Sequence, residues 1–122
     1  MATPEETQMP ATTIHLAIQD WIAASNRHNA DAYLSFFAED AVLDDPSVGR
    51  AFIGKQGIAE YFQSYFIEYE TQTRLVELQE QDGLVHVEVD FAGKFPGGQT
   101  GGIFDLAFTQ DGLIHHVWAD LS

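Results

Sequence analysis

The sequence predicts a single α+β domain, in which helices come first and a run of antiparallel strands follows. In the first half of the chain apolar residues recur at helical spacing, whereas from residue 74 onward they alternate with a period of two. "QDG" at 81–83 and at 110–112 marks two hairpin turns in that second part. The 122 residues, 45% of them hydrophobic, suffice for one folded domain over 12–122. Residues 1–11 carry no such pattern and are expected to form a disordered N-terminal tail.

Three helices are expected, two before the first strand and one after it. Thr12 or Thr13 can cap the first helix, which should stop between Asn26 and Asn29, a run of poor helix formers. A short second helix is predicted over 30–37, and a third over 55–67 after Gly54.

Five strands are expected, and the third of them shows the pattern most clearly. Valines at 85, 87 and 89 and Phe91 alternate with polar residues, which predicts one packed face and one polar face. The predicted strands cover residues 41–45, 74–81, 84–95, 100–110 and 113–121.

The charge balance bears on partners and location. The chain has 19 acidic and 5 basic residues, a formal net charge of −14, which repels phosphate backbones and anionic lipids. We therefore expect no nucleic acid and no membrane as partner. The first residues are acidic where a signal peptide is basic, so a cytoplasmic location is expected. The chain has no cysteine and no histidine pair at metal-ligand spacing, and we expect neither a metal nor a cofactor.

Two adjacent carboxylates end the first predicted strand, in "AEDAVLDDP". Neighbouring strand residues point to opposite faces, so Asp44 and Asp45 cannot both face water if the strand covers a core. An Asp–Pro pair can simply start a turn, which explains one aspartate but not two.

The order of elements, together with "FFAEDAVLDDP" and "IGKQGIAEYF", resembles the NTF2-like superfamily and within it the SnoaL-like and ketosteroid-isomerase-like families. The resemblance implies a cone, in which a curved antiparallel sheet wraps around the long N-terminal helix and encloses an apolar pocket. It implies that Asp45, directly before the proline, is a general base. It also implies that Asp105 donates a hydrogen bond to an enolate oxygen, and it puts Trp21 in the place of the family's oxyanion tyrosine.

The strand pattern of "GGIFDLAF" leads to a related expectation. Phe104, Leu106 and Phe108 share one face, and Asp105 lies with Ile103 on the other. Asp105 is either a satisfied structural carboxylate or a desolvated, neutral acid in the pocket. With Asp105 in the pocket the three apolar side chains lie outside, and such an apolar face predicts a homodimer.

The pocket is expected to hold a small apolar molecule. Among the histidines at 115 and 116, strand parity selects His115 as the inward one. Glu68 and Glu70 are solvated helix-end acids or a second carboxylate near Asp45. The predicted pocket residues are Phe62, Val85, Val87, Val89, Ile103, His115, Val117 and Ala119.

The function that follows is a cofactor-independent isomerase- or cyclase-type enzyme, in which an aspartate enolises a small apolar carbonyl compound of steroid or polyketide type. Two alternatives stay open. One is a non-catalytic domain that binds a small ligand or a partner, and the other is a dehydratase or epoxide hydrolase of the same fold.

Overall fold

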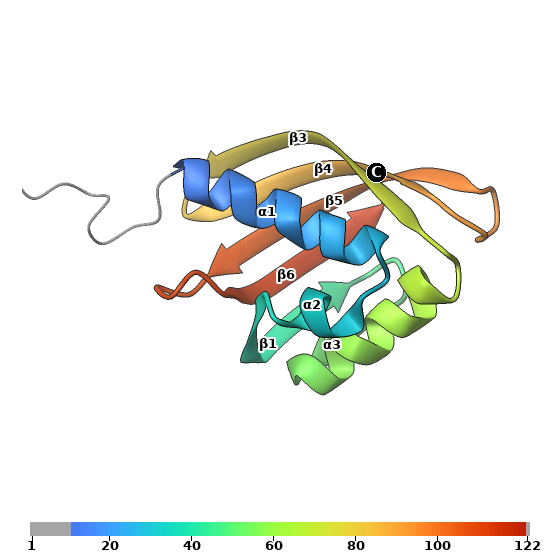
Figure 1. Ribbon diagram of the computed structural model, residues 1–122, viewed down its shortest axis with the longest axis horizontal. Helices are drawn as coiled ribbons and strands as arrows, with labels where there is room; N and C mark the ends of the chain where they lie inside the picture. Colours follow the sequence, from blue (N-terminus) through green and yellow to red (C-terminus); the bar gives the residue numbers. More distant parts are fainter. Residues whose placement is uncertain (1–10, 122) are drawn as a thin grey trace, which may run out of the picture.

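A six-stranded sheet curves around the first helix in the computed structural model, which describes residues 11–121 (Figure 1). The predicted tail, residues 1–11, lies outside the described residues except for Ala11, where the first helix begins. The elements are α1 (Ala11–Asn26), α2 (Ala30–Leu34), β1 (Phe37–Asp45), β2 (Arg50–Ile53), α3 (Gly54–Phe62), the π-helical turn η2 (Gln63–Ile67), β3 (Gln72–Gln81), β4 (Leu84–Ala92), β5 (Gln99–Phe108) and β6 (Ile114–Leu121). This arrangement confirms the α+β class and the cone.

The strands lie in the order β2-β1-β6-β5-β4-β3. Consecutive strands from β3 to β6 pair antiparallel, as do β1 and β2, but β1 and β6 run parallel. The expectation of a wholly antiparallel sheet is therefore wrong at one pair. The cause is that β1 enters the sheet from the helices, so no hairpin forces it to oppose its neighbour β6.

α1 lies across the concave face of the sheet and supplies much of the core (Figure 1). Ile14, Ile18 and Trp21 are buried on the side of α1 that faces the strands, while Leu16 is exposed. Their i, i+4 and i, i+3 spacing places them on one stripe of the helix. Burial of each such large apolar side chain stabilises the fold by about 1.5–3 kcal/mol.

The short elements differ most from the expectations. α2 ends at Leu34 rather than at residue 37, because Phe37 already pairs in β1, and Asn29 Oδ1 caps its start by accepting from Ala32 N–H at 3.1 Å. The strand β2 was not expected. Its residues pair with β1 from Asp45 back to Val42, which makes β1 an inner strand.

The face assignment on β5 is wrong. Phe104 and Leu106 point into the core, with exposed fractions of 4% and 0%. The reason is the register of the β4–β5 hairpin, in which Val87 faces Phe104 across the strands, so that both side chains lie on the concave side. Asp105 and Ile103 consequently lie on the convex side.

The inward direction of His115 is also wrong. The β5–β6 pairing shifts register between Ala107 and Phe108, so that Ile114 and Val117 are both buried. His115 is the extra residue between them and is exposed. A bulge of this kind adds one residue to a strand and reverses its parity.

Candidate active site

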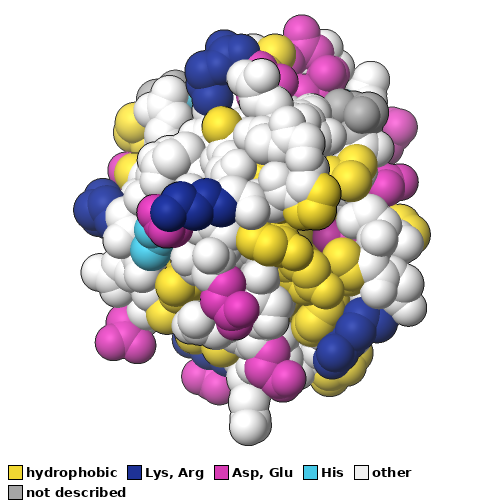
Figure 2. Space-filling view, turned by 90° about the vertical axis from the view of Figure 1, so that its right-hand side faces the viewer, with side chains coloured by type: hydrophobic (Ala, Val, Ile, Leu, Met, Phe, Trp, Pro, Cys, Tyr) yellow, Lys and Arg dark blue, Asp and Glu magenta, His cyan; other side chains and the backbone are white. Residues whose placement is uncertain are grey.

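A cavity of about 380 Å³ opens at the end of the cone where α3 and η2 approach the β4–β5 hairpin. Figure 2 shows hydrophobic side chains gathered on this face of the molecule. This size and an aromatic wall suit a small organic ligand. The cavity is lined by Asp45, Ser47, Val48, Tyr61, Tyr65, Phe66, Tyr69, Thr71, Phe91, Phe95, Pro96, Thr100 and Leu121.

Three tyrosines, Tyr61, Tyr65 and Tyr69, form one wall. They follow one another at i, i+4, Tyr61 in α3, Tyr65 in η2 and Tyr69 in the turn after η2. The ring centroids of Tyr61 and Tyr65 lie 5.4 Å apart, and those of Tyr65 and Tyr69 lie 6.4 Å apart. The π-helical turn η2 widens the helix here, and Glu68 N–H donates to Gln63 C=O at 3.0 Å. As a result Tyr61 also contacts Phe66, with ring centroids 5.8 Å apart.

Asp45 is the acidic group of the cavity. It is the last residue of β1 and only 6% exposed. Its Oδ1 accepts two hydrogen bonds from Ser47, from the backbone N–H at 3.0 Å and from the hydroxyl at 2.5 Å. Its Oδ2 accepts one from the Tyr61 hydroxyl at 3.0 Å. Three donors thus compensate for the burial of the carboxylate.

Tyr61 is kept neutral by this arrangement. Burial raises the pKa of Tyr61 well above its ordinary value, and the negative charge of Asp45 raises it further. Tyr61 therefore acts as a hydrogen-bond donor to Asp45 and does not become a phenolate.

Asp44 lies on the opposite side of the sheet, as the strand parity predicts. His116 Nε2 lies 2.6 Å from Asp44 Oδ2, and the His116 ring stacks on Trp118 with centroids 3.9 Å apart. The two adjacent carboxylates therefore have separate environments, a convex surface for Asp44 and a buried cavity for Asp45.

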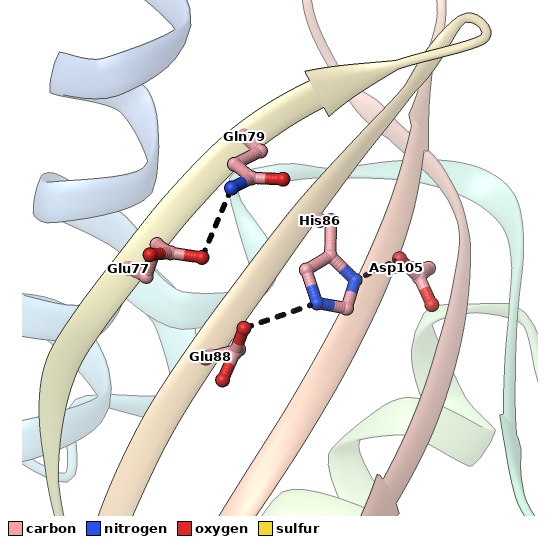
Figure 3. Close-up of polar contacts among 5 residues, drawn as sticks. All are labelled: Glu77, Gln79, His86, Glu88 and Asp105. Atoms are coloured by element: carbon pink, nitrogen blue, oxygen red, sulfur yellow. Dashed lines mark hydrogen bonds and ion pairs between the residues drawn. The ribbon is translucent and has the colours of Figure 1, made fainter.

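Asp105 does not approach the cavity. It faces His86 across the β4–β5 hairpin, with Asp105 Oδ1 2.7 Å from His86 Nδ1, while Glu88 lies 3.6 Å from the other ring nitrogen (Figure 3). The hydrogen bond to Asp105 raises the pKa of His86. Of the two roles expected for Asp105, the structure therefore agrees with that of a structural carboxylate, which has its hydrogen-bond partner on the convex face.

Trp21 lies in the core rather than at the large cavity. Its ring contacts Phe104 edge-on at 5.3 Å and stacks on Tyr33 at 5.9 Å. Phe62 is buried under Tyr33 at 4.0 Å. The predicted pocket residues Val85, Val87, Val89, Val117 and Ala119 are buried, but they pack in the core and do not line the cavity.

Other acids stay outside the cavity. Glu68 is exposed, and Glu70 pairs with Lys94 at 2.8 Å, an interaction that lowers the pKa of Glu70. Among residues 11–121, Asp45 is the one carboxylate that lines the cavity. Within the same residues no group of three or more histidine or acidic side chains is arranged to hold a metal ion. No helix in this part of the chain has the length and apolar character needed to cross a membrane.

Most of the cavity wall was missed from the sequence. The tyrosines at 61, 65 and 69 could have been found, because a repeat of four along a helix marks one stripe. Phe95, Pro96 and Thr100 could not, because they come from the β4–β5 hairpin, whose bend toward α3 depends on the curvature of the sheet.

The SnoaL-like domain profile matches residues 18–117 of this chain. The chain therefore belongs to the SnoaL-like domain family, and its fold is that of the NTF2-like proteins. No curated protein sequence matches the chain.

Solved structures with the same fold come from several bacteria. A candidate ketosteroid isomerase from Kribbella flavida has 17% identity and a TM-score of 0.77, covering 91% of this chain and 78% of that one. A candidate polyketide cyclase from Sinorhizobium meliloti has 20% identity and a TM-score of 0.76, covering 84% and 92%. A Mycobacterium tuberculosis protein in complex with estradiol-17β-hemisuccinate has 17% identity and a TM-score of 0.73, covering 87% and 91%. At these identities the likeness establishes the fold alone.

Proposed function

We propose that this protein is a cofactor-independent isomerase- or cyclase-type enzyme that enolises a small apolar carbonyl compound. The observation that carries the proposal is the position of Asp45, a buried carboxylate in the wall of an aromatic cavity of about 380 Å³. Steroid- and polyketide-like compounds suit such a wall, and the Mycobacterium tuberculosis relative is seen with a steroid derivative.

Asp45 Oδ2 is the atom proposed to take the proton. Oδ1 already accepts two hydrogen bonds, whereas Oδ2 accepts only the one from Tyr61 and keeps a second acceptor position. Oδ2 removes a proton from the carbon next to the substrate carbonyl. The C–H electrons form a C=C bond, and the carbonyl π electrons move to oxygen. Return of the proton from Asp45 to a different carbon completes an isomerisation and regenerates the carboxylate.

The donors to the enolate oxygen differ from those that the family resemblance implied. Asp105 lies on the convex face and Trp21 in the core, so neither is proposed for this role. Tyr65 and Tyr69 line the cavity beside Asp45 and carry phenol hydroxyls, which can donate to a developing oxyanion. We assign the oxyanion donor to this pair.

A non-catalytic small-ligand domain is the second candidate. It is favoured because the cavity has a single acidic residue, Asp45, and none of the other described residues adds a second carboxyl group to its wall. The dehydratase or epoxide hydrolase alternative would be favoured by His115 or a second carboxylate in the cavity. His115 is exposed, Glu70 pairs with Lys94, and neither residue lines the cavity, so this alternative has less support.

Assembly and location are also proposals. We propose a homodimer through the convex face of the sheet, where Trp118 is 42% exposed and Ile103 lies on the neighbouring strand. Phe104 and Leu106, which were expected on the outer face, are in the core and do not contribute to this surface. We also propose a cytoplasmic location.

The test separates binding from chemistry. Isomerisation of β,γ-unsaturated ketones by wild type and by Asp45→Asn should differ by about 10² to 10⁴-fold in rate. Binding of a naphthol, followed by fluorescence, should survive in Asp45→Asn. Asp105→Ala should leave both readouts close to wild type. Naphthol binding without turnover of any ketone would favour the non-catalytic candidate, and absence of both would contradict the proposal.

A further inference from the structure

A second, much smaller cavity lies between α1 and the sheet, with a volume of about 10 Å³. A cavity needs a volume of at least roughly 10–15 Å³ to hold one water molecule, and the small cavity lies at this limit. Phe66 belongs to the walls of both cavities and therefore lies between them. The small cavity is lined by Trp21, Ile22, Ser25, Tyr33, Phe66, Thr73 and Phe104.

Three polar atoms of this wall are buried and unpaired. Trp21 Nε1, Ser25 Oγ and Thr73 Oγ1 form no hydrogen bond of normal geometry with a described residue, although Trp21 lies close enough to Tyr33 to act on the pKa of the Tyr33 hydroxyl. The exposed fractions of the three residues are 3%, 4% and 7%. Buried polar side chains nearly always have a partner, so three unpaired ones around a single cavity require an explanation.

The backbone brings these groups together in a defined way. Trp21 and Ser25 lie one turn apart on α1, on the same side of the helix. Thr73 comes from β3 and is tied to the end of α1 by Asn26. Asn26 Oδ1 accepts from Thr73 N–H at 2.7 Å, and Asn26 Nδ2 donates to Thr73 C=O at 2.9 Å. This two-point bond fixes β3 against α1 at the cavity.

We propose that the small cavity is a binding site for one internal water molecule, held by Trp21, Ser25 and Thr73. The donor and acceptor types agree with this occupant. The indole N–H can only donate, so it donates to the water oxygen, and each hydroxyl can either donate or accept. One water can accept from Trp21 and from one hydroxyl while it donates to the other.

The water gives Trp21 a structural role. Its one hydrogen-bond donor is used inside the core, on the far side of Phe66 from the large cavity. Trp21 thereby joins α1 to β3 through solvent, which positions the helix over the sheet and does not polarise a ligand.

The experiment is a crystal structure at a resolution that orders internal water, together with water–protein NOE spectra of the apo protein. The chain has two tryptophans, so the indole proton of Trp118, which lies on the convex face and does not line the small cavity, is the internal control. We expect one water within hydrogen-bond distance of all three atoms, and a cross-peak of a long-lived water at the Trp21 indole proton only. Thr73→Val should lose the water, and Thr73→Ser, which keeps the hydroxyl, should retain it. A dry cavity in wild type, or an indole N–H bonded to a protein atom, would overturn the proposal even if Thr73→Val does not fold.

Discussion

The hydroxyl of Tyr61 donates to Asp45 Oδ2 at 3.0 Å, and this bond joins the helical wall of the cavity to the end of β1. Both side chains are buried, with exposed fractions of 4% and 6%. The bond orients the carboxylate that we propose as the base, and it occupies one acceptor position of the oxygen that would take the proton.

Tyr61→Phe should therefore reduce the free energy of unfolding by about 1–3 kcal/mol, because it leaves a buried carboxylate with one donor fewer. Urea unfolding at neutral pH measures this. Tyr65→Phe is the matched control, since it removes a phenol hydroxyl from the same wall without removing a donor to Asp45. Equal losses of stability in both variants would show that the Tyr61–Asp45 hydrogen bond contributes no more to the free energy of unfolding than the Tyr65 hydroxyl does.

Gly102→Ala should narrow the large cavity. A methyl group on Gly102 would overlap the ring of Phe91, which lines the cavity and packs edge-on against Phe66 at 5.8 Å. We expect a stability loss of about 1–3 kcal/mol from overpacking and a several-fold weaker naphthol affinity. Phe91→Leu in the Gly102→Ala background should restore part of the stability, which a double-mutant cycle measures. Additive losses would contradict the predicted overlap.

The pH dependence of stability should contain a contribution from His86. Its hydrogen bond to Asp105 raises the pKa of His86 above the ordinary 6.5, and Glu88 acts in the same direction. A raised pKa stabilises the fold fully below pH 6.5, and that contribution disappears as the pH rises through the folded-state pKa. His86→Gln should thus cost up to about 1 kcal/mol more in acid than in base.

Denaturant unfolding of wild type and His86→Gln, repeated at several pH values from about 5.5 to 9, measures this difference in stability across the titration range of histidine. The exposed His15, replaced in His15→Gln, is the control on α1. A cost of His86→Gln that does not change with pH would mean that the pair with Asp105 is not charged in solution.

Some of the candidate site could be predicted from the sequence and some could not. The last five residues of β1, 41–45, alternate without interruption, so parity correctly separates Asp44 from Asp45. On β5 the alternation shows two faces but does not say which one is inside. The polar residues that alternate with the valines of β4 were expected on the polar face and Asp105 was placed in the pocket, yet the register pairs Asp105 directly with His86, and pairing partners share a face.

Local irregularities account for the other differences. The bulge at His115 reverses the inward and outward alternation of side chains within β6, and no residue type in "LIHHVW" indicates a bulge. The π-helical turn at 63–67 changes which side chains share one side of the helix, because it brings Phe66 as well as Tyr65 against Tyr61. The two longer helices and the four C-terminal strands were predictable because the segments that show their periods are long.

The proposed homodimer predicts a solution mass of twice the 13.6 kDa chain at micromolar concentration. Trp118→Glu should give the monomer, because it removes an exposed ring from the convex face and adds a negative charge in both copies. Leu16→Ala, which changes an exposed apolar residue on α1, should remain dimeric. Light scattering distinguishes these masses, and a monomeric wild type would contradict the proposed dimer.

The proposed chemistry is tested most directly by deuterium incorporation from D₂O into the α-carbon of an apolar ketone, followed by NMR. Wild type should exchange this position, and Asp45→Asn should slow the exchange by about 10² to 10⁴-fold. Asp44→Asn changes the neighbouring carboxylate on the convex face and should exchange at nearly the wild-type rate. Equal losses in the two variants, or exchange that is unaffected by Asp45→Asn, would contradict the assignment of Asp45 as the base.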